Sequence, residues 1–348
     1  MGQTDLFGTE KISKILLKLA PPVMLAQLIQ ALYNIIDSLF VGRYSDSGLT
    51  ALSIIYPLQL LMIALAVGTG VGINTVMAAK LGVGNEKEAD EYAGVGTPLA
   101  GFMWLLFAVI CWFAMPFYAK MSTNSEVIIH DVIVYGRIVC VFSFGLFLES
   151  IWTKVLQSCG DMKTPMTAQI IGAITNIVLD PLLIFGMFGF PKMGIAGAAI
   201  ATVAGQMFSM ILGFILNQTK NPELKLSFRR FRPKGETMKN ILTVGFPSII
   251  MQSISSVMSL LFNLILMPFG NAAVSVLGVY FKLQSFVFMP VFGLSNGLVA
   301  IVGYNYGARL KKRVYESVKV ALVYAIAIMA AGMVLFMAIP NVLMGLFD

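Results

Sequence analysis

The sequence predicts an all-α, polytopic membrane protein with nine transmembrane helices. Of its 348 residues, 58% are hydrophobic and only 12% are charged, whereas about 25% is usual in a soluble domain. A soluble fold has too thin a polar shell to cover so much apolar surface. The composition therefore excludes a soluble enzyme, a disordered chain and a secreted disulfide scaffold. The three cysteines are far apart and show no metal-ligand or CxxC spacing.

Nine apolar runs are long enough to cross a bilayer, which takes about 20 helical residues. The first, Ile15–Gly42, is too long for a cleaved signal peptide and lacks a small-residue cleavage site. The others are, in order, Leu49–Ala79, Tyr92–Ala119, Val127–Val155, Pro165–Met187, Gly194–Leu216, Ile241–Pro268, Val274–Tyr304 and Val314–Met344. Several exceed the thickness of the bilayer, so we expect them to tilt, kink or protrude.

Lysine and arginine are concentrated in alternate connecting segments. With the N-terminus inside, the inner segments carry 17 of them, Lys154 included, and the outer loops carry only Arg43, Lys120 and Lys192. Because cytoplasmic loops are enriched in these residues, we expect a multi-pass protein of the cell (cytoplasmic) membrane with a cytoplasmic N-terminus. The net charge of +7 then needs no nucleic-acid partner. The basic stretch Phe228–Lys234 is a topological determinant or, less favoured, a site for anionic lipid headgroups.

An internal repeat relates the two sides of the polar segment Asn217–Lys239. A shift of 225 residues pairs Pro22 with Pro247, Gln27 with Gln252, Gln59 with Gln284, Gly68 with Gly293, Gly72 with Gly297 and Gly82 with Gly307. A six-helix unit re-enters on the same side, so we expect a transporter fold of two parallel six-helix lobes. The expected divisions are an N-terminal lobe at 1–216, a basic cytoplasmic loop at 217–239 and the first three helices of the second lobe at 240–348. We expect the second lobe to be truncated, since three counterpart helices would follow Asp348.

Ionisable residues inside a membrane span are costly, at about 2.5 kcal/mol or more each, and commonly mark an ion or substrate path. Those well inside the predicted spans are Asp37, Arg137, Glu149, Asp180 and Lys282, with Lys319 nearer a helix start. The expected topology places four polar residues at a similar depth in the outer half of the N-terminal lobe: Asp37, Tyr135, Asp180 and Thr202.

Helical spacing groups some of these residues on common faces. Asn176 and Asp180 lie four residues apart, as do Tyr33 and Asp37. Low dielectric favours the protonated form of a carboxylate, so such a group can hold and release a proton, or bind a sodium ion. The alternative is that Asp37 reaches the outer surface and Asp180 pairs with a helix terminus. The convergence of two acids with an asparagine favours a binding site.

Other conspicuous residues are open to simpler interpretations. Pro22 is either a gating hinge or a residue that shapes its helix. The GxxxG pairs predict close helix packing. The stretch Gly293–Gly297 matches the GxSxG nucleophile elbow, but its place in an apolar span argues against a hydrolase. An adaptable substrate cavity is predicted to include Gln30, Asn34, Met251, Gln252, Phe281, Gln284 and Met289.

Segments from both halves of the chain are similar to those of one transporter family. They are Pro21–Tyr44, Gly68–Ala89, Leu156–Met166, Thr175–Gly186, Gly194–Thr202, Gly245–Gln252 and Gly303–Ala308. In combination they resemble the multidrug and toxic compound extrusion (MATE) family. The resemblance implies a secondary active antiporter that exports organic, often cationic, drugs in exchange for protons or sodium ions by alternating access.

The resemblance also implies roles for individual residues. The family's cation site in the N-terminal lobe is matched by Asp37, Asn176, Asp180 and Thr202, to which we add Tyr33 and Tyr135. The helix-one proline that bends as its aspartate changes protonation is matched by Pro22. The seventh span contains no acid, although one branch of the family has a glutamate there, so coupling is expected in the N-terminal lobe. The implied coupling ion is H⁺ or Na⁺, and no other cofactor is expected.

The expected partners are small organic molecules and the lipid bilayer, with no nucleic acid and no obligate protein partner. The main alternative is a flippase for lipid-linked oligosaccharides or cell-wall precursors on the same scaffold. Their anionic pyrophosphates would need several arginines in the cavity, and Arg137 alone lies well inside a span. A structural subunit is the third alternative, but paired buried aspartates have no evident use there.

Overall fold

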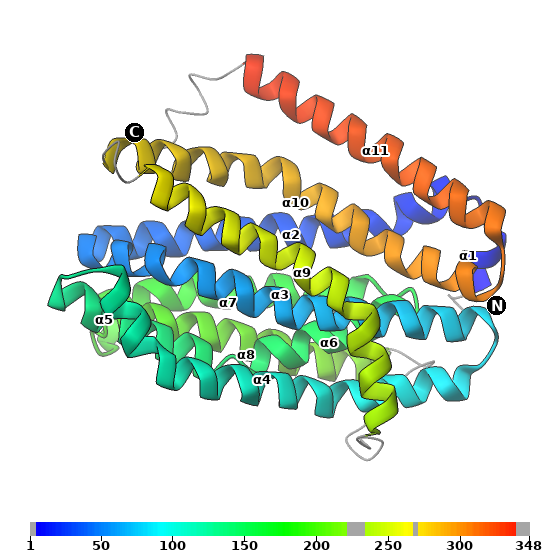
Figure 1. The fold of residues 1–348 in the computed structure, drawn as a ribbon, viewed down its shortest axis with the longest axis horizontal. Helices are drawn as coiled ribbons and strands as arrows, with labels where there is room; N and C mark the ends of the chain where they lie inside the picture. The colour runs from blue at the N-terminus through cyan, green and yellow to red at the C-terminus, as the bar shows by residue number, and fades with distance from the viewer. Residues whose placement is uncertain (1–4, 221–233, 267–270, 339–348) are drawn as a thin grey trace.

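The computed structural model is a bundle of α-helices and describes residues 5–220, 234–266 and 271–338 (Figure 1). Its helices are α1 (Asp5–Thr9), α2 (Ile12–Tyr44), α3 (Asp46–Gly82), α4 (Glu86–Ser122), α5 (Glu126–Val141), α6 (Phe144–Ser158), α7 (Lys163–Phe185), α8 (Ile195–Lys220), α9 (Gly235–Leu266), α10 (Asn271–Gly307) and α11 (Lys311–Ala338), with a 3₁₀ turn at Met187–Gly189. Among these residues, eight helices are long and apolar enough to span a membrane, and α5 with α6 forms a bent ninth. The all-α membrane fold predicted from the sequence is confirmed.

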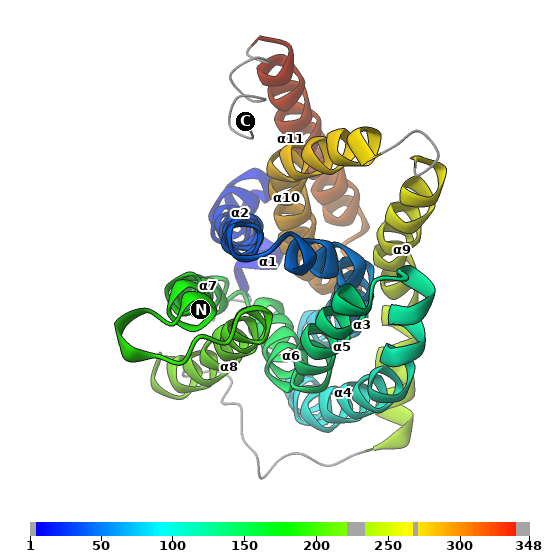
Figure 2. The ribbon, with the colours of Figure 1, turned by 90° about the vertical axis from the view of Figure 1, so that its left-hand side faces the viewer.

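The long helices run roughly along one axis of the bundle (Figures 1 and 2). One end carries Lys80, Lys163 and Arg313 and is called the basic end below. The opposite end, the distal end, carries the turn at Ser45 between α2 and α3 and the start of α5 at Glu126. Residues 221–233 of the connecting segment, most of the basic stretch included, lie outside the described residues. Lys234, at the edge of that segment, pairs with Glu91 of α4 at 2.7 Å.

The fourth predicted span is not one straight helix. It breaks at Phe142 and Ser143, and α5 and α6 meet at a bend of 41°. The hydroxyl of Ser143 donates to the carbonyl oxygen of Cys140 at 2.7 Å, so the side chain competes for a backbone acceptor. A Cβ atom on Gly145 would lie only 3.0 Å from the backbone of Gln206 in α8. The bend thus brings α6 directly against α8.

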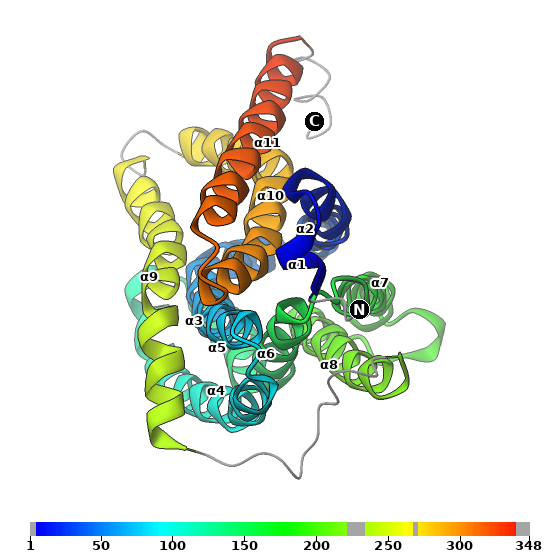
Figure 3. The same cartoon turned by 90° about the vertical axis from the view of Figure 1, so that its right-hand side faces the viewer.

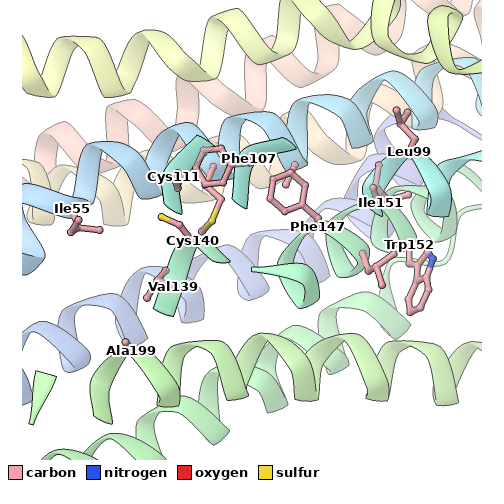
Figure 4. Packing of buried hydrophobic residues seen from close by; sticks show 14 of the residues in the cluster. Ile55, Leu99, Phe107, Cys111, Val139, Cys140, Phe147, Ile151, Trp152 and Ala199 are labelled. Carbon is pink, nitrogen blue, oxygen red and sulfur yellow. The ribbon is translucent and has the colours of Figure 1, made fainter. Parts of the chain in front are cut away.

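A large apolar core joins α3 to α8. Aromatic and aliphatic side chains from α4, α5 and α6 interdigitate there, and the sulfur atoms of Cys111 and Cys140 face one another (Figure 4). All three cysteines are free and buried. The indole nitrogen of Trp152 donates to the hydroxyl of Thr97 at 2.8 Å, which satisfies the one polar atom of that side chain. This core holds α6 in a fixed position beside α7 and α8.

Glycines of α3 and α10 allow the two halves of the chain to approach closely. A Cβ atom on Gly68 would lie 2.8 Å from the backbone nitrogen of Ile249 in α9. The counterparts of these two residues, 225 positions away, are Gly293 and Met24, and a Cβ atom on Gly293 would lie 2.7 Å from the nitrogen of Met24. The contact is therefore made twice, with the two halves exchanging roles, as expected of a repeat about an axis between them.

The same exchange occurs at the basic end. A Cβ atom on Gly82 would overlap the carbonyl oxygen of Tyr304, and one on Gly307 would overlap that of Ala79, the counterpart of Tyr304. Only glycine leaves room for the backbones at these positions. These contacts support the predicted internal repeat. The division into lobes at 216 and 240 stays a prediction, because α9 packs mainly along α3 and only slightly along α10.

The short helix α1 was not predicted, and it is held by the other half of the chain (Figure 3). Phe7 packs edge-on against Tyr304 with ring centroids 5.6 Å apart. One guanidinium nitrogen of Arg313 donates to the carbonyl oxygens of Phe7 at 2.8 Å and Glu10 at 2.6 Å. A cation at the C-terminal end of a helix satisfies carbonyls that lack helical partners.

We expect Arg313→Ala to release α1 from α10 and α11. Hydrogen bonds from a charged donor contribute about 1.5–3 kcal/mol each, so trypsin cleavage after Lys11 should become at least about tenfold faster. The measurement is loss of an N-terminal epitope tag from membrane-embedded protein during limited proteolysis. Lys312→Ala removes a neighbouring exposed cation and should leave the rate unchanged; equal rates in both variants would contradict the proposed anchor.

Candidate functional site

A polar cavity lies between α2, α6, α7 and α8. It offers about 70 Å³ to the centres of water molecules, enough for several waters or a partly hydrated ion. Its polar lining consists of Gln30, Tyr33, Glu149, Gln169, Asn176, Thr202, Gln206 and Ser209. Beside it α7 and α8 come very close, since a Cβ atom on Gly172 would lie 2.7 Å from the carbonyl oxygen of Gly205.

The predicted cation-site residues gather at the end of this cavity nearer the distal end. Asp37 is 6% exposed, Asn176 2%, Asp180 0% and Thr202 7%. The amide nitrogen of Asn176 donates to one carboxylate oxygen of Asp180 at 3.3 Å. Asp37 of α2 lies close enough to Asp180 of α7 for the two carboxylates to interact electrostatically. Asn176 and Thr202 line the cavity, with the two aspartates behind them.

Two tyrosines complete this group. Tyr33 lines the cavity beside both aspartates. Tyr135 of α5 is 1% exposed and accepts a hydrogen bond from the amide nitrogen of Gln59 at 3.3 Å. Its ring also lies close to Asp37 and Thr202. The structure therefore brings together residues from four helices, α2, α5, α7 and α8, that the sequence separates by up to 169 positions.

The unpaired atoms in this group are all oxygens. In this group, four buried oxygen atoms have no hydrogen-bond partner among the described residues: Oδ1 of Asp37, Oδ1 of Asn176, Oδ2 of Asp180 and Oγ1 of Thr202. A buried polar atom without a partner costs about 1–3 kcal/mol. Protons or a hard cation such as Na⁺ would satisfy this set of acceptors. In the same part of the chain no three His, Cys, Asp or Glu side chains converge.

The other predicted residues are spread over several surfaces. Gln30 lines the polar cavity, whereas Asn34 is exposed and Met251 is 63% exposed. The side-chain nitrogen of Gln252 donates back to Ser248 of its own helix at 3.2 Å. Gln284 and Met289 are half-buried on α10, and the Phe281 side chain lies outside the described residues. Their grouping in one substrate cavity stays a prediction.

Pro22 lies inside α2, which continues as one helix through Pro21 and Pro22 to Tyr44. Its side chain is half-buried. Both interpretations of Pro22, as a hinge or as a residue that shapes the helix, therefore stay open.

Sequence reasoning did not assign Glu149, Gln169, Gln206 and Ser209 to the site. Helical periodicity could have indicated two of them, because Gln169 lies two helical turns before Asn176 and Ser209 lies two turns after Thr202. Glu149 was recognised only as an ionisable residue within a span. Its place in the cavity depends on the bend before α6, which no pattern in the sequence predicted.

Two cations of the first half have unexpected positions. Lys154 was counted among the lysines of the connecting segments, and this was wrong: it lies within α6 and is 4% exposed. Its ammonium group donates to Oε1 of Gln157 at 3.0 Å and to Oδ1 of Asn296 in α10 at 2.8 Å. Arg137 stacks on Trp112, 4.5 Å from the ring centroid, and does not line the cavity.

Known proteins share both the sequence pattern and the fold. A sequence model of the MatE family matches residues 22–182 and 247–348. The probable multidrug resistance protein NorM of Thermotoga maritima is 28% identical over 97% of this chain and 72% of its own length. The FAD transporter of Shewanella oneidensis is 26% identical over 90% of this chain and 70% of its own length. The crystal structure of a MATE protein in complex with MaD3S superposes with a TM-score of 0.88 at 25% identity, over 99% of this chain and 77% of that one.

These matches confirm the resemblance predicted from the sequence. The family match covers more than half of the chain and includes Asp37, Asn176 and Asp180. The fold agrees over nearly the whole of the described helices. The chain therefore belongs to the MatE family, and it is a multi-pass membrane transporter rather than an enzyme.

Proposed function

We propose that this chain is part of a secondary active antiporter that exports organic, often cationic, compounds in exchange for protons or sodium ions. The observation that carries the proposal is the set of buried, unpaired oxygens on Asp37, Asn176, Asp180 and Thr202. Carboxylates without a bound cation or proton are costly at membrane depth. A bound ion is therefore released only when another event compensates for its loss. Competition with a cationic substrate supplies that compensation.

The proposed orientation places the basic end in the cytoplasm of a bacterial cell. With Lys154 removed from the count, lysine and arginine still lie overwhelmingly at that end. A proton or sodium ion entering from the distal side then reaches Asp37 and Asp180 first and moves inward. One charge that crosses 100 mV supplies about 2.3 kcal/mol, enough for a roughly fifty-fold substrate gradient.

The proposed mechanism depends on the contacts between the two halves of the chain. The glycine contacts hold the two halves together at the basic end. Cation binding between α2 and α7 removes the repulsion between Asp37 and Asp180 and changes how α2 packs. Because α2 also packs along α10, the change reaches the second half, and the halves rock to open the basic end.

The substitutions Asp37→Asn and Asp180→Asn test this function. We expect each to reduce ion-driven efflux of an organic cation such as ethidium to background in cells and in liposomes. Asp46→Asn makes the same chemical change at an exposed position and should retain full efflux. If both buried variants transport as well as the parent chain, the assignment is wrong.

The flippase alternative gains no support from the cavity. A pyrophosphate headgroup requires cationic ligands, and the cavity lining contains a glutamate and no arginine or lysine among the described residues. The guanidinium group of Arg137 stacks on the ring of Trp112 and donates a hydrogen bond to the carbonyl oxygen of that residue at 3.4 Å. The charge of the cavity thus favours a small cation over a pyrophosphate headgroup.

A further inference from the structure

The polar cavity contains a third carboxylate that the proposed function does not use. Glu149 projects into it from α6. One of its oxygens accepts hydrogen bonds from the hydroxyl of Thr153 at 2.8 Å and from the amide nitrogen of Gln169 at 2.8 Å. In the part of the chain that the structure describes, it forms no ion pair. A carboxylate held only by neutral donors inside a membrane span is costly unless a cation or proton joins it.

Glu149 lies at the opposite end of the cavity from the aspartates. Its partner Gln169 is seven residues before Asn176 on α7, which at 1.5 Å per residue places the two levels about 10 Å apart along the helix. Because α7 begins at the basic end with Lys163, Glu149 is the carboxylate nearer that end. An ion entering beside Asp180 would pass Glu149 on its way to the basic end.

Unpaired oxygens bridge the distance between these two levels. Oε1 of Gln206 and Oγ of Ser209 in α8 are buried, have no hydrogen-bond partner among the described residues and line the same cavity. Ser209 is 6% exposed. Together with the unpaired oxygens of Asn176 and Thr202, they form a continuous series of acceptors along one wall. Such a series can hold waters or successive ligands of a small cation.

The groups around Glu149 include one cation, which interacts with it without forming an ion pair. From α2 it faces the phenol of Tyr33, and from its own helix it interacts with Lys154. The Lys154 ammonium is directed toward Gln157 and Asn296 instead. At this level α7 and α8 contribute only amides and hydroxyls to the cavity.

We propose that Glu149 is a second binding position for the coupling cation, a proton or sodium ion, between the Asp37–Asp180 pair and the basic end. The inference rests on the proposed antiport function and extends it: the ion occupies the aspartates first and Glu149 second. If the ion is a proton, the O–H bond at an aspartate breaks and one forms at Glu149, through the cavity waters. Gln169 and Thr153 position the carboxylate by hydrogen bonds and do not bind the ion themselves.

The number of ions or protons bound by the Glu149→Gln variant tests the proposal without requiring transport. Glutamine keeps the size of the side chain and an oxygen that accepts from Gln169 and Thr153, so the fold is retained. Glu126→Gln, at an exposed position on α5, is the matched control. The purified full chain is examined for ²²Na⁺ binding, and for the infrared carbonyl band of a protonated buried carboxylic acid that shifts in D₂O.

We expect Glu149→Gln to lose one bound sodium ion per chain, or one protonated-acid band, while Glu126→Gln loses neither. Asp180→Asn should lose a different ion or band, and the double variant both. If Glu149→Gln matches the parent chain in both measurements, the second position is refuted, whereas a loss confined to Asp180→Asn leaves the proposed function intact. If the parent chain itself shows neither signal, both proposals fail.

Discussion

Replacing Gly307 with alanine is expected to destabilise the protein by at least about 1–3 kcal/mol, the usual range for overpacking. The added methyl group would overlap the carbonyl oxygen of Ala79, a backbone atom that only a shift of α3 can move away. Gly82→Ala should have the same effect, because its methyl group would overlap the carbonyl oxygen of Tyr304. The midpoint of heat unfolding in detergent measures both.

Gly101 provides the control for this prediction. It lies within α4, and a Cβ atom there would have open space around it. Alanine is favoured over glycine in a helix interior by about 1 kcal/mol, so Gly101→Ala should raise the unfolding midpoint. The expected shifts therefore have opposite signs for one and the same chemical change. A neutral or stabilising Gly307→Ala would show that α3 and α10 do not pack as described.

The second large effect is expected at the partly buried contact between Lys154 and Asn296. Asn296→Ala removes the acceptor 2.8 Å from the Lys154 ammonium and leaves Gln157 as its remaining neighbour. A hydrogen bond to a charged group contributes about 1.5–3 kcal/mol, and the stranded charge adds to the loss. We therefore expect a destabilisation of about 2–3 kcal/mol in the parent chain.

A double-mutant cycle separates this contact from general loss of packing. Lys154→Met removes the charge but keeps a long apolar side chain, a replacement that buried charges often tolerate. In that background Asn296→Ala should cost less than about 1 kcal/mol. Asn34→Ala, at an exposed site on α2, serves as the single-variant control. Equal costs of Asn296→Ala in both backgrounds would mean that the two side chains are not coupled.

Most of the fold was predictable because a membrane imposes so few solutions. A helix must supply about 20 apolar residues to cross it, and runs of that kind are visible without any knowledge of packing. The break before α6 was not visible, since Gly145 differs from other small residues only through its contact with α8, and Ser143 only through its hydrogen bond to Cys140. Helix α1 was missed because it is a five-residue helix that depends on Arg313.

The candidate site was likewise predictable from the sequence only in part. Asn176 and Asp180 were grouped by the period of a single helix, and Tyr33 and Asp37 by the same rule. Their convergence on one cavity required three-dimensional information, as did the presence of Glu149 beside them. The position of Lys154 was misjudged because a lysine four residues from a helix end is normally solvated. Here Gly70 makes room for its stem, since a Cβ atom on Gly70 would lie 2.7 Å from Cγ of Lys154.

The anchoring of α1 by Arg313 has a consequence for biosynthesis. The two hydrogen-bonded partners Phe7 and Arg313 are 306 residues apart, and a ribosome that adds 5–20 residues per second needs about 15–60 s to cover that interval. During this time Ile15, Leu16 and Leu19 lack the side chains of α10 against which they pack in the finished chain. The first long helix to enter the membrane thus completes its contact with α10 late, and the insertion machinery must release it in a state that still accepts this neighbour.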